Sequence, residues 1–127
     1  MENLVKDFLK QKKFAIVGSF RNESKYAYKI LKTLIKKGYE VYPVNPSLDD
    51  VDGIKCYKRI SDIPFNIDVA NLVTPPSVSE AIVKECWKKS IKRVWLQPGA
   101  ESEAAIKFCR DNGIDVIYGL CVMVESR

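Results

Sequence analysis

Apolar residues are distributed along the chain in two patterns: short continuous runs, and a spacing of three or four positions. Short runs of consecutive apolar residues recur, each bounded by charged residues or by Gly, Pro and Asn. Such runs are typical of strands that are buried on both faces of a parallel sheet. They predict main strands at residues 14–17, 40–44, 67–73, 93–96 and 115–118.

Between these runs, apolar residues recur every three or four positions, as they do along one face of a helix. In residues 25–37 the apolar side chains share one face, and the lysines occupy the opposite one. The same period predicts helices over residues 3–12, 25–37, 77–90 and 101–112. Ser77 and Glu80 have the spacing of a capping box, which predicts the start of the third of these helices.

Strands that alternate with helices of this length predict a doubly wound α/β fold around a five-stranded parallel sheet. We expect one domain over residues 1–127, with the main strands in the order 3-2-1-4-5. The segment 47–66 has no regular period. Within it we expect only a short strand near 54–57 and a helical turn at 61–63.

The amino-acid composition narrows the kinds of catalytic and binding site that this chain can form. The 127 residues include no histidine, which excludes Ser-His-Asp and Cys-His nucleophile pairs and histidine metal ligands. The net charge is +5, and residues 1–60 hold 13 of the 21 Lys and Arg but only 7 of the 16 Asp and Glu. This excess indicates either a solvated basic surface or an anionic partner. A small phosphorylated ligand is favoured over nucleic acid, because the lysines have helical spacing without interleaved aromatic residues.

The four cysteines have no metal-binding spacing, and two of them, Cys86 and Cys109, fall on apolar faces of predicted helices. No run approaches the roughly 18 apolar residues that a membrane-spanning helix needs. We therefore expect a cytoplasmic protein with reduced thiols, no bound metal and no membrane segment.

In a parallel sheet, ligands bind at the carboxyl ends of the strands, where the strand order reverses. Here that point lies beside the first strand. The loop after this strand contains Gly18 and leads into a helix N-terminus, which is a suitable site for phosphate. Ser19 and Ser24 would offer hydroxyl groups, and Arg21 and Lys25 would offer positive charge. In the alternative interpretation, Ser24 only caps the helix and Arg21 is solvated.

The other three rim loops carry proline, in Asn45-Pro46, Pro75-Pro76 and Pro98-Gly99. Prolines could form flat apolar walls against an adenine ring, or they could simply stiffen these loops. The first loop has one glycine instead of G-x-G-x-x-G, and the second strand ends without an acid for a ribose diol. Both features count against a nicotinamide or flavin dinucleotide, and no Walker A loop occurs.

Three ordered segments carry a resemblance to a known family: Phe14-Ala15-Ile16-Val17-Gly18-Ser19, Gly38 to Pro46, and Val94 to Gly99. Gly113-Ile114-Asp115-Val116, Cys121 and Glu125 add to it. Over nearly its full length the chain resembles the small stand-alone CoA-binding proteins. These are relatives of the Rossmann-like CoA-binding domains in succinyl-CoA synthetase and ADP-forming acyl-CoA synthetases.

The resemblance implies a three-layer Rossmann-like domain that binds coenzyme A or an acyl-CoA without catalysis of its own. Cys121 would either lie near the CoA sulfur or be structural. The alternatives are a CoA-binding subunit of an acyl-CoA ligase, whose relatives pass phosphate through a histidine that this chain lacks, and an NAD-type regulator. The implied phosphate-binding residues are Gly18, Ser19, Phe20, Arg21, Ser24 and Lys25. The implied walls for the adenosine and pantetheine are Val44, Asn45, Pro46, Thr74, Pro75 and Pro76, and Gln97, Pro98 and Gly99 would lie near the end of the arm.

Overall fold

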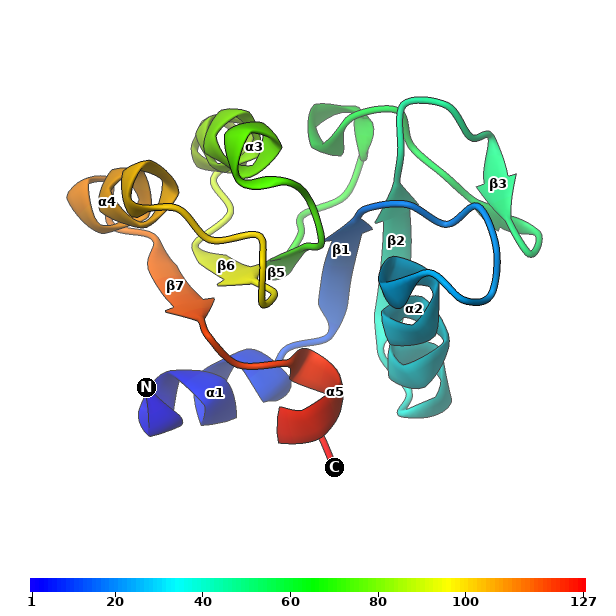
Figure 1. Cartoon of the computed structure of the whole chain (residues 1–127), viewed down its shortest axis with the longest axis horizontal. Helices are drawn as coiled ribbons and strands as arrows, with labels where there is room; N and C mark the ends of the chain where they lie inside the picture. Colours follow the sequence, from blue (N-terminus) through cyan, green and yellow to red (C-terminus); the bar gives the residue numbers. More distant parts are fainter.

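A computed structural model describes residues 1–127 as three layers, with a five-stranded parallel sheet between two layers of helices (Figure 1). The strands of the sheet are β1 (Lys13–Val17), β2 (Glu40–Val44), β5 (Val69–Leu72), β6 (Arg93–Leu96) and β7 (Asp115–Tyr118). One face carries α1 (Glu2–Leu9), α2 (Tyr26–Lys36) and α5 (Val122–Glu125), and the other carries α3 (Pro76–Lys88) and α4 (Glu103–Asp111). None of these helices combines the length and the apolar character that a membrane crossing requires.

Each face of the sheet has its own apolar core, because successive side chains of a strand point to opposite faces. In β1, Ala15 and Val17 pack in the cluster under α3 and α4, whereas Phe14 and Ile16 pack in the cluster under α1 and α2. The strands β1, β5 and β6 are buried along almost all of their length, as the continuous apolar runs predict.

The predicted strand order is wrong. The sheet runs β2-β1-β5-β6-β7, so the third main strand, β5, pairs directly with β1 and not with β2. Pro43 lies within β2 and has no N–H to donate, which suits an edge strand and not the interior position that 3-2-1-4-5 requires. The parallel sheet and the alternating strands and helices are confirmed.

The irregular segment after β2 explains why β5 returns to β1. It forms the hairpin β3 (Asp50–Val51) and β4 (Ile54–Lys55), followed by the 3-10 turn η1 (Ile60–Asp62). Tyr57 lies against the open edge of β2 and donates its N–H to the carbonyl of Pro43 at 2.9 Å. Asp68 then accepts hydrogen bonds from the N–H groups of Lys12 and Lys13, which brings the start of β5 beside β1.

The predicted helices are present, with ends that differ by one to three residues. The capping box is wrong, because α3 begins at Pro76 with Pro75 as its N-cap, and proline is favoured in a first helical turn. Ser79 lies inside the helix, where its hydroxyl pairs with that of Thr74 at 2.7 Å. The sequence pattern gave no indication of the short helix α5.

Candidate functional site

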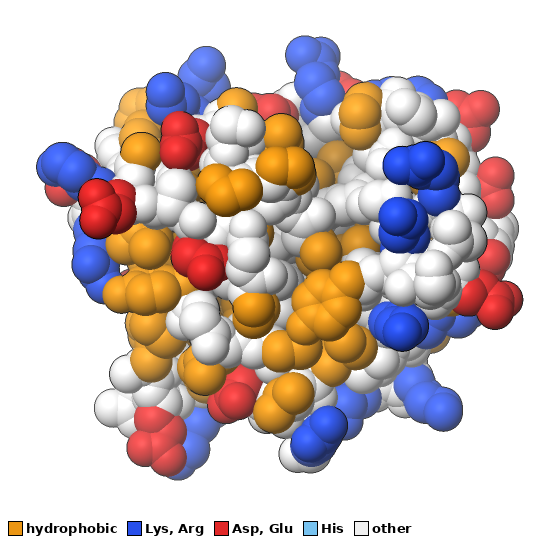
Figure 2. Space-filling model, in the orientation of Figure 1, with side chains coloured by type: hydrophobic (Ala, Val, Ile, Leu, Met, Phe, Trp, Pro, Cys, Tyr) orange, Lys and Arg blue, Asp and Glu red, His pale blue; other side chains and the backbone are white.

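The crevice of this fold lies between β1 and β5, beside the first strand as predicted. The chain leaves β1 towards α2 on one face and leaves β5 towards α3 on the other, so the two loops diverge at the carboxyl ends of the strands. Such divergence leaves a crevice in doubly wound sheets. In Figure 2 this face of the molecule is hollowed near its centre, with Lys and Arg side chains to the right of the hollow.

The hollow contains a cavity of about 380 Å³, within the range of small-molecule sites. Four segments line it: the ends of β1, β2 and β5 with the start of α3, and the chain after β4. We call it the rim cavity. Its lining residues are Val17, Gly18, Ser19, Val44, Asn45, Pro46, Lys58, Arg59, Ile60, Val73, Thr74, Pro75, Val78, Ile82 and Glu85. Seven of the fifteen predicted ligand-binding residues therefore come together here: Gly18, Ser19, Val44, Asn45, Pro46, Thr74 and Pro75.

Gly18 allows the elements around the rim cavity to approach one another. A Cβ atom at this position would lie 2.7 Å from the Cβ of Ala27 and 3.0 Å from the carbonyl oxygen of Val73. These distances are shorter than ordinary carbon contacts, so a side chain here would push α2 and the end of β5 away from β1. Gly18 is therefore required here because it has no side chain.

Asn45 joins the ends of β1 and β2. Its Nδ2 donates to the carbonyl of Gly18 at 2.7 Å, and its Oδ1 accepts from the N–H of Ser47 at 2.8 Å. Because both ends of the carboxamide are used within the protein, Asn45 shapes the wall of the rim cavity and holds Pro46 beside it.

Two basic residues, Lys58 and Arg59, enter the rim cavity from the segment after β4. Lys58 has partners within the protein, since its Nζ lies 2.9 Å from the carboxylate of Asp49 and 3.1 Å from the carbonyl of Leu48. Arg59 is freer: its nearest acid, Asp62, is 3.9 Å away, and 71% of its side chain is exposed. Arg59 is therefore the most available positive charge of this cavity.

Comparison with known sequences identifies the family of this chain. The family model for the CoA binding domain matches residues 12–127. The chain belongs to the CoA binding domain family. The resemblance seen in the sequence is thus confirmed.

Relatives of this CoA binding domain fall into two kinds. Acetate–CoA ligase [ADP-forming] of Methanocaldococcus jannaschii is 41% identical over 64% of this chain, but the matched part is only 12% of the ligase. The uncharacterized protein YneT of Bacillus subtilis is 27% identical over 94% of this chain and 90% of its own length. Most ligase relatives are therefore several times longer than the region they share with this chain.

Solved structures show the same fold. A conserved hypothetical protein from Pyrococcus furiosus superposes with a TM-score of 0.87 at 43% identity, covering 91% of this chain and 99% of that one. A hypothetical protein from Pyrococcus horikoshii superposes with a TM-score of 0.93 at 34% identity, covering 98% and 87%. The three-layer Rossmann-like domain is thus shared by structures of similar size.

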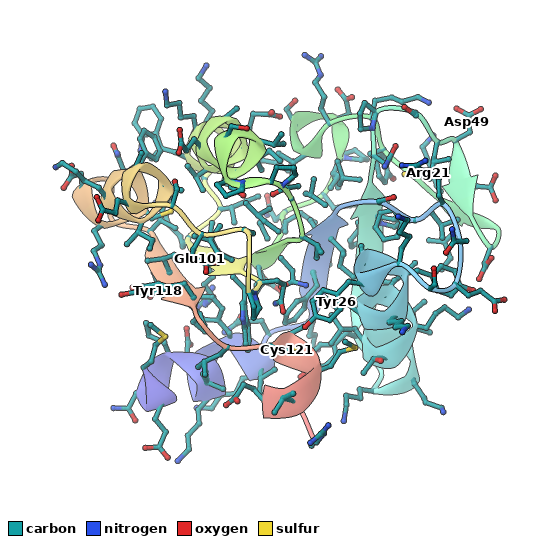
Figure 3. The ribbon with its side chains drawn as sticks, in the orientation of Figure 1. Arg21, Tyr26, Asp49, Glu101, Tyr118 and Cys121 are labelled. Carbon is teal, nitrogen blue, oxygen red and sulfur yellow. The ribbon has the colours of Figure 1, made fainter.

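The structure does not bring the charged part of the first loop into the rim cavity. Arg21 is exposed on the outer part of the loop, on the side of the β3–β4 hairpin and Asp49 (Figure 3). Ser24 hydrogen-bonds Asn22, so it neither caps α2 nor lines the cavity, and Lys25 is the N-cap residue without a side-chain cap bond. Phe20 is buried in the core beside α2. Of the predicted first-loop residues, only Gly18 and Ser19 line the rim cavity.

The loop after β6 lines a separate shallow hollow of about 270 Å³. Pro98 and Gly99 form one side of it, and Thr74 and Pro75 form the other and are shared with the rim cavity. Gln97 lies beneath this rim, fully buried, and Pro76 is exposed in the first turn of α3. The two hollows together follow an elongated path across the ends of β1, β5 and β6.

Three of the four cysteines, Cys56, Cys86 and Cys109, are buried as small apolar side chains. Burial raises the pKa of the Cys109 thiol to about 12 and also raises that of the Cys86 thiol. Cys121 is half-buried as the N-cap residue of α5, and the hydroxyl of Tyr26 donates a hydrogen bond to its sulfur (Figure 3). Burial and this hydrogen bond raise the pKa of Tyr26 to about 12. No group of three or more acidic or cysteine side chains is arranged to hold a metal ion.

Sequence reasoning missed the contribution of Lys58, Arg59 and Glu85 to the rim cavity. The pair Lys58-Arg59 was visible as two adjacent cations, but the irregular segment 47–66 gave no basis for placing it. Glu85 follows the period of α3, and nothing in that period distinguishes it from the exposed polar residues of the same helix. Its Oε1 is buried without a hydrogen-bond partner.

Proposed function

We propose that this chain binds coenzyme A or an acyl-CoA at the rim cavity and catalyses no reaction on its own. The observation that carries the proposal is the position of an open cavity at the β1–β5 crevice of a chain from the CoA binding domain family. Ligands of doubly wound sheets bind at that crevice.

The shape of the two hollows supports an elongated ligand. CoA consists of an adenosine with three phosphates and a thin pantetheine arm that ends in a thiol. The rim cavity combines apolar walls such as Val44, Val78 and Ile82 with the cation of Arg59, which suits a base and ribose with nearby phosphate. The hollow shared by Pro75 and Pro98 gives the arm a path towards the end of β6. By this account Gly99 and the backbone at Gln97 line the far end of the arm.

The proposal of a purely binding role rests on the side chains that could act as nucleophiles or bases. The chain has no histidine, and burial raises the pKa values of the Cys86 and Cys109 thiols, which disfavours their nucleophilic thiolate forms. Lys58 forms an ion pair with Asp49, and the carboxamide of Asn45 is not a titratable group.

A second candidate function is that of a CoA-binding subunit which works with a catalytic partner chain. It is favoured by the 33% identity, over 68% of this chain, to the alpha subunit of an acetate–CoA ligase [ADP-forming] from Pyrococcus furiosus, of which the matched part is 19%. The purified chain incubated with acetate, ATP and CoA should form no ADP under either proposal. ADP formation by the chain alone would contradict the purely binding role.

Titration calorimetry tests the binding itself. We expect CoA to bind with a Kd of about 10 µM or tighter, and acetyl-CoA to bind similarly because its acyl group lies beyond the nucleotide. NAD should give no measurable heat at the same concentrations. Heat with NAD and none with CoA would reject the proposed ligand.

Filling the rim cavity tests the site. Val78 lines this cavity on α3 and is 43% exposed, so Val78→Trp adds bulk to the cavity without disturbing the core. We expect at least a tenfold loss of CoA affinity, measured by calorimetry, because the indole occupies the space of the ligand. Val124→Trp on α5 is the matched control, since Val124 is 46% exposed and lies outside this cavity. Equal affinities of the two variants would place the ligand elsewhere.

A further inference from the structure

A second cavity adjoins the rim cavity and has a different chemistry. It has a volume of about 450 Å³ and is lined by Arg59, Ser61, Glu85, Lys88 and Lys89, without any apolar side chain. Arg59 and Glu85 line both cavities, so the two meet along these residues. We call it the basic cavity. A ligand in the rim cavity could extend a polar group into it past Arg59.

The cations of the basic cavity are poorly neutralised within the protein. Arg59 has only the distant Asp62, and such exposed pairs contribute about 0–1 kcal/mol. Lys88 forms no ion pair, and Lys89 donates to the carbonyl of Ile63 at 2.5 Å, so its charge also remains uncompensated by an acid. The hydrogen bond of Lys89 also fixes the end of η1 against the end of α3.

The position of these residues is not explained by the helix alone. Lys88 and Lys89 end α3, where the helix dipole favours cations. Arg59, the N-cap residue of η1, and Ser61 within η1 nevertheless line the same cavity. Glu85 is the single acid of the basic cavity. Its buried Oε1 has no partner and could accept a hydrogen bond from a ligand hydroxyl at the boundary of the two cavities.

Three cations and a hydroxyl suit a phosphate monoester, which carries a charge of about −1.5 to −2 at neutral pH. Arginine and lysine bind such a group through charge-assisted hydrogen bonds, which are stronger than those to neutral acceptors. A diester phosphate within a chain carries one charge only. The two charges of an internal pyrophosphate are spread over two phosphate groups, whereas the cations of the basic cavity surround a single space. This cavity therefore favours a terminal phosphate monoester over the internal pyrophosphate of a dinucleotide.

We propose that the basic cavity binds the 3′-phosphate of CoA while the adenosine occupies the rim cavity. Arg59, Lys88 and Lys89 hold the phosphate, so these residues make the chain select CoA over otherwise identical ligands without that phosphate. This inference rests on the proposed function, since it names which part of the ligand lies where. It also places the principal phosphate contact after β4 and at the end of α3 and not at Arg21 and Lys25.

The test compares CoA with dephospho-CoA, which differs only by the 3′-phosphate. We expect the unmodified chain to bind CoA at least tenfold more tightly than dephospho-CoA. In the double variant Arg59→Gln/Lys88→Gln this preference should fall to within about twofold, because the affinity for CoA falls much more than the affinity for dephospho-CoA. Lys84→Gln/Arg127→Gln is the control, because it removes the same charge from exposed positions outside both cavities.

The outcomes separate the two proposals. If the unmodified chain binds neither ligand, the proposed function fails. If it binds both equally, or if the Arg59/Lys88 variant loses both ligands to the same extent, CoA binding stands and the phosphate assignment is overturned. Loss of the preference in Arg21→Gln/Lys25→Gln, with the preference retained in the Arg59/Lys88 variant, would return the phosphate to the first loop.

Discussion

At the scale of single residues, Gly18 decides how closely β1, α2 and the end of β5 meet. At each of the other five glycines, an added Cβ atom would have no other atom within 4 Å, apart from those of its chain neighbours. The other five have positive φ angles, so they serve the backbone conformation, whereas Gly18 serves the packing beneath the rim cavity. In this chain, the glycines that a positive φ angle requires are thus different from the one that close packing requires.

Gly18→Ala should therefore destabilise the fold by about 1–3 kcal/mol, as measured by urea denaturation, because the added methyl group overpacks the junction. The companion change Ala27→Gly removes the nearest of the three atoms that the methyl group would touch. In that background the loss should be smaller by about 1 kcal/mol. If the effects of the two substitutions on the unfolding free energy were additive, the added methyl group would not be in conflict with the side chain of Ala27.

At the scale of elements, Gln97 connects three of them beneath the rim. Its Nε2 donates to the Oδ1 of Asn71 in β5 at 2.5 Å, and its Oε1 accepts from the N–H of Val122 at the start of α5. All of these groups are buried. These hydrogen bonds of Gln97 position α5, and with it Cys121 beside Tyr26. A helix of only four residues is too short to be stable without such tertiary contacts.

Gln97→Leu should cost about 2–4 kcal/mol of unfolding free energy, because Asn71 and the N–H of Val122 each lose a buried partner. Gln11→Leu is the control, since Gln11 makes its hydrogen bonds within four residues at the partly exposed end of α1. That change should cost less than about 0.5 kcal/mol. Equal losses of unfolding free energy in the two variants would mean that the hydrogen bonds of Gln97 do not stabilise the fold.

The elements also show what the sequence could and could not predict. Strand and helix positions followed from periodicity, because burial on one or two faces leaves a direct pattern. The order of the strands did not follow, although Pro43 already indicated that β2 is an edge strand. The rim loops with Gly18, Asn45 and Pro75 were predicted because any parallel sheet collects its loops at one edge.

The basic side of the site could not be predicted, because it depends on long-range packing. Arg59 reaches the crevice only because Tyr57 lies against the edge of β2 and fixes the irregular segment there. Conversely, Arg21 and Lys25 have the right charge at the right loop, but the loop turns outward before α2 begins. Local charge patterns identify candidates, and the path of the backbone decides which of them line the rim cavity.

At the scale of the whole molecule, the cations that remain available near the crevice are few, although the net charge is +5. Many of the lysines lie on exposed helix faces, where a salt solution screens their charges beyond about 10 Å. Binding should therefore depend on the fit of one ligand to the rim cavity and the basic cavity more than on the overall positive charge. A polyanion without an adenosine should gain little from this surface.

Thermal denaturation tests this view on the intact protein. A ligand that binds only the folded state adds about 2.7 kcal/mol of stability at a concentration of 100 times its Kd. For a domain of this size that corresponds to a rise in Tm of about 8–15 °C with CoA. Inorganic triphosphate at equal concentration should raise Tm by less than a third of that amount, because it leaves the rim cavity empty. Val78→Trp should remove most of the CoA effect, and a full shift with triphosphate would instead mean that the charge of the surface alone attracts the ligand.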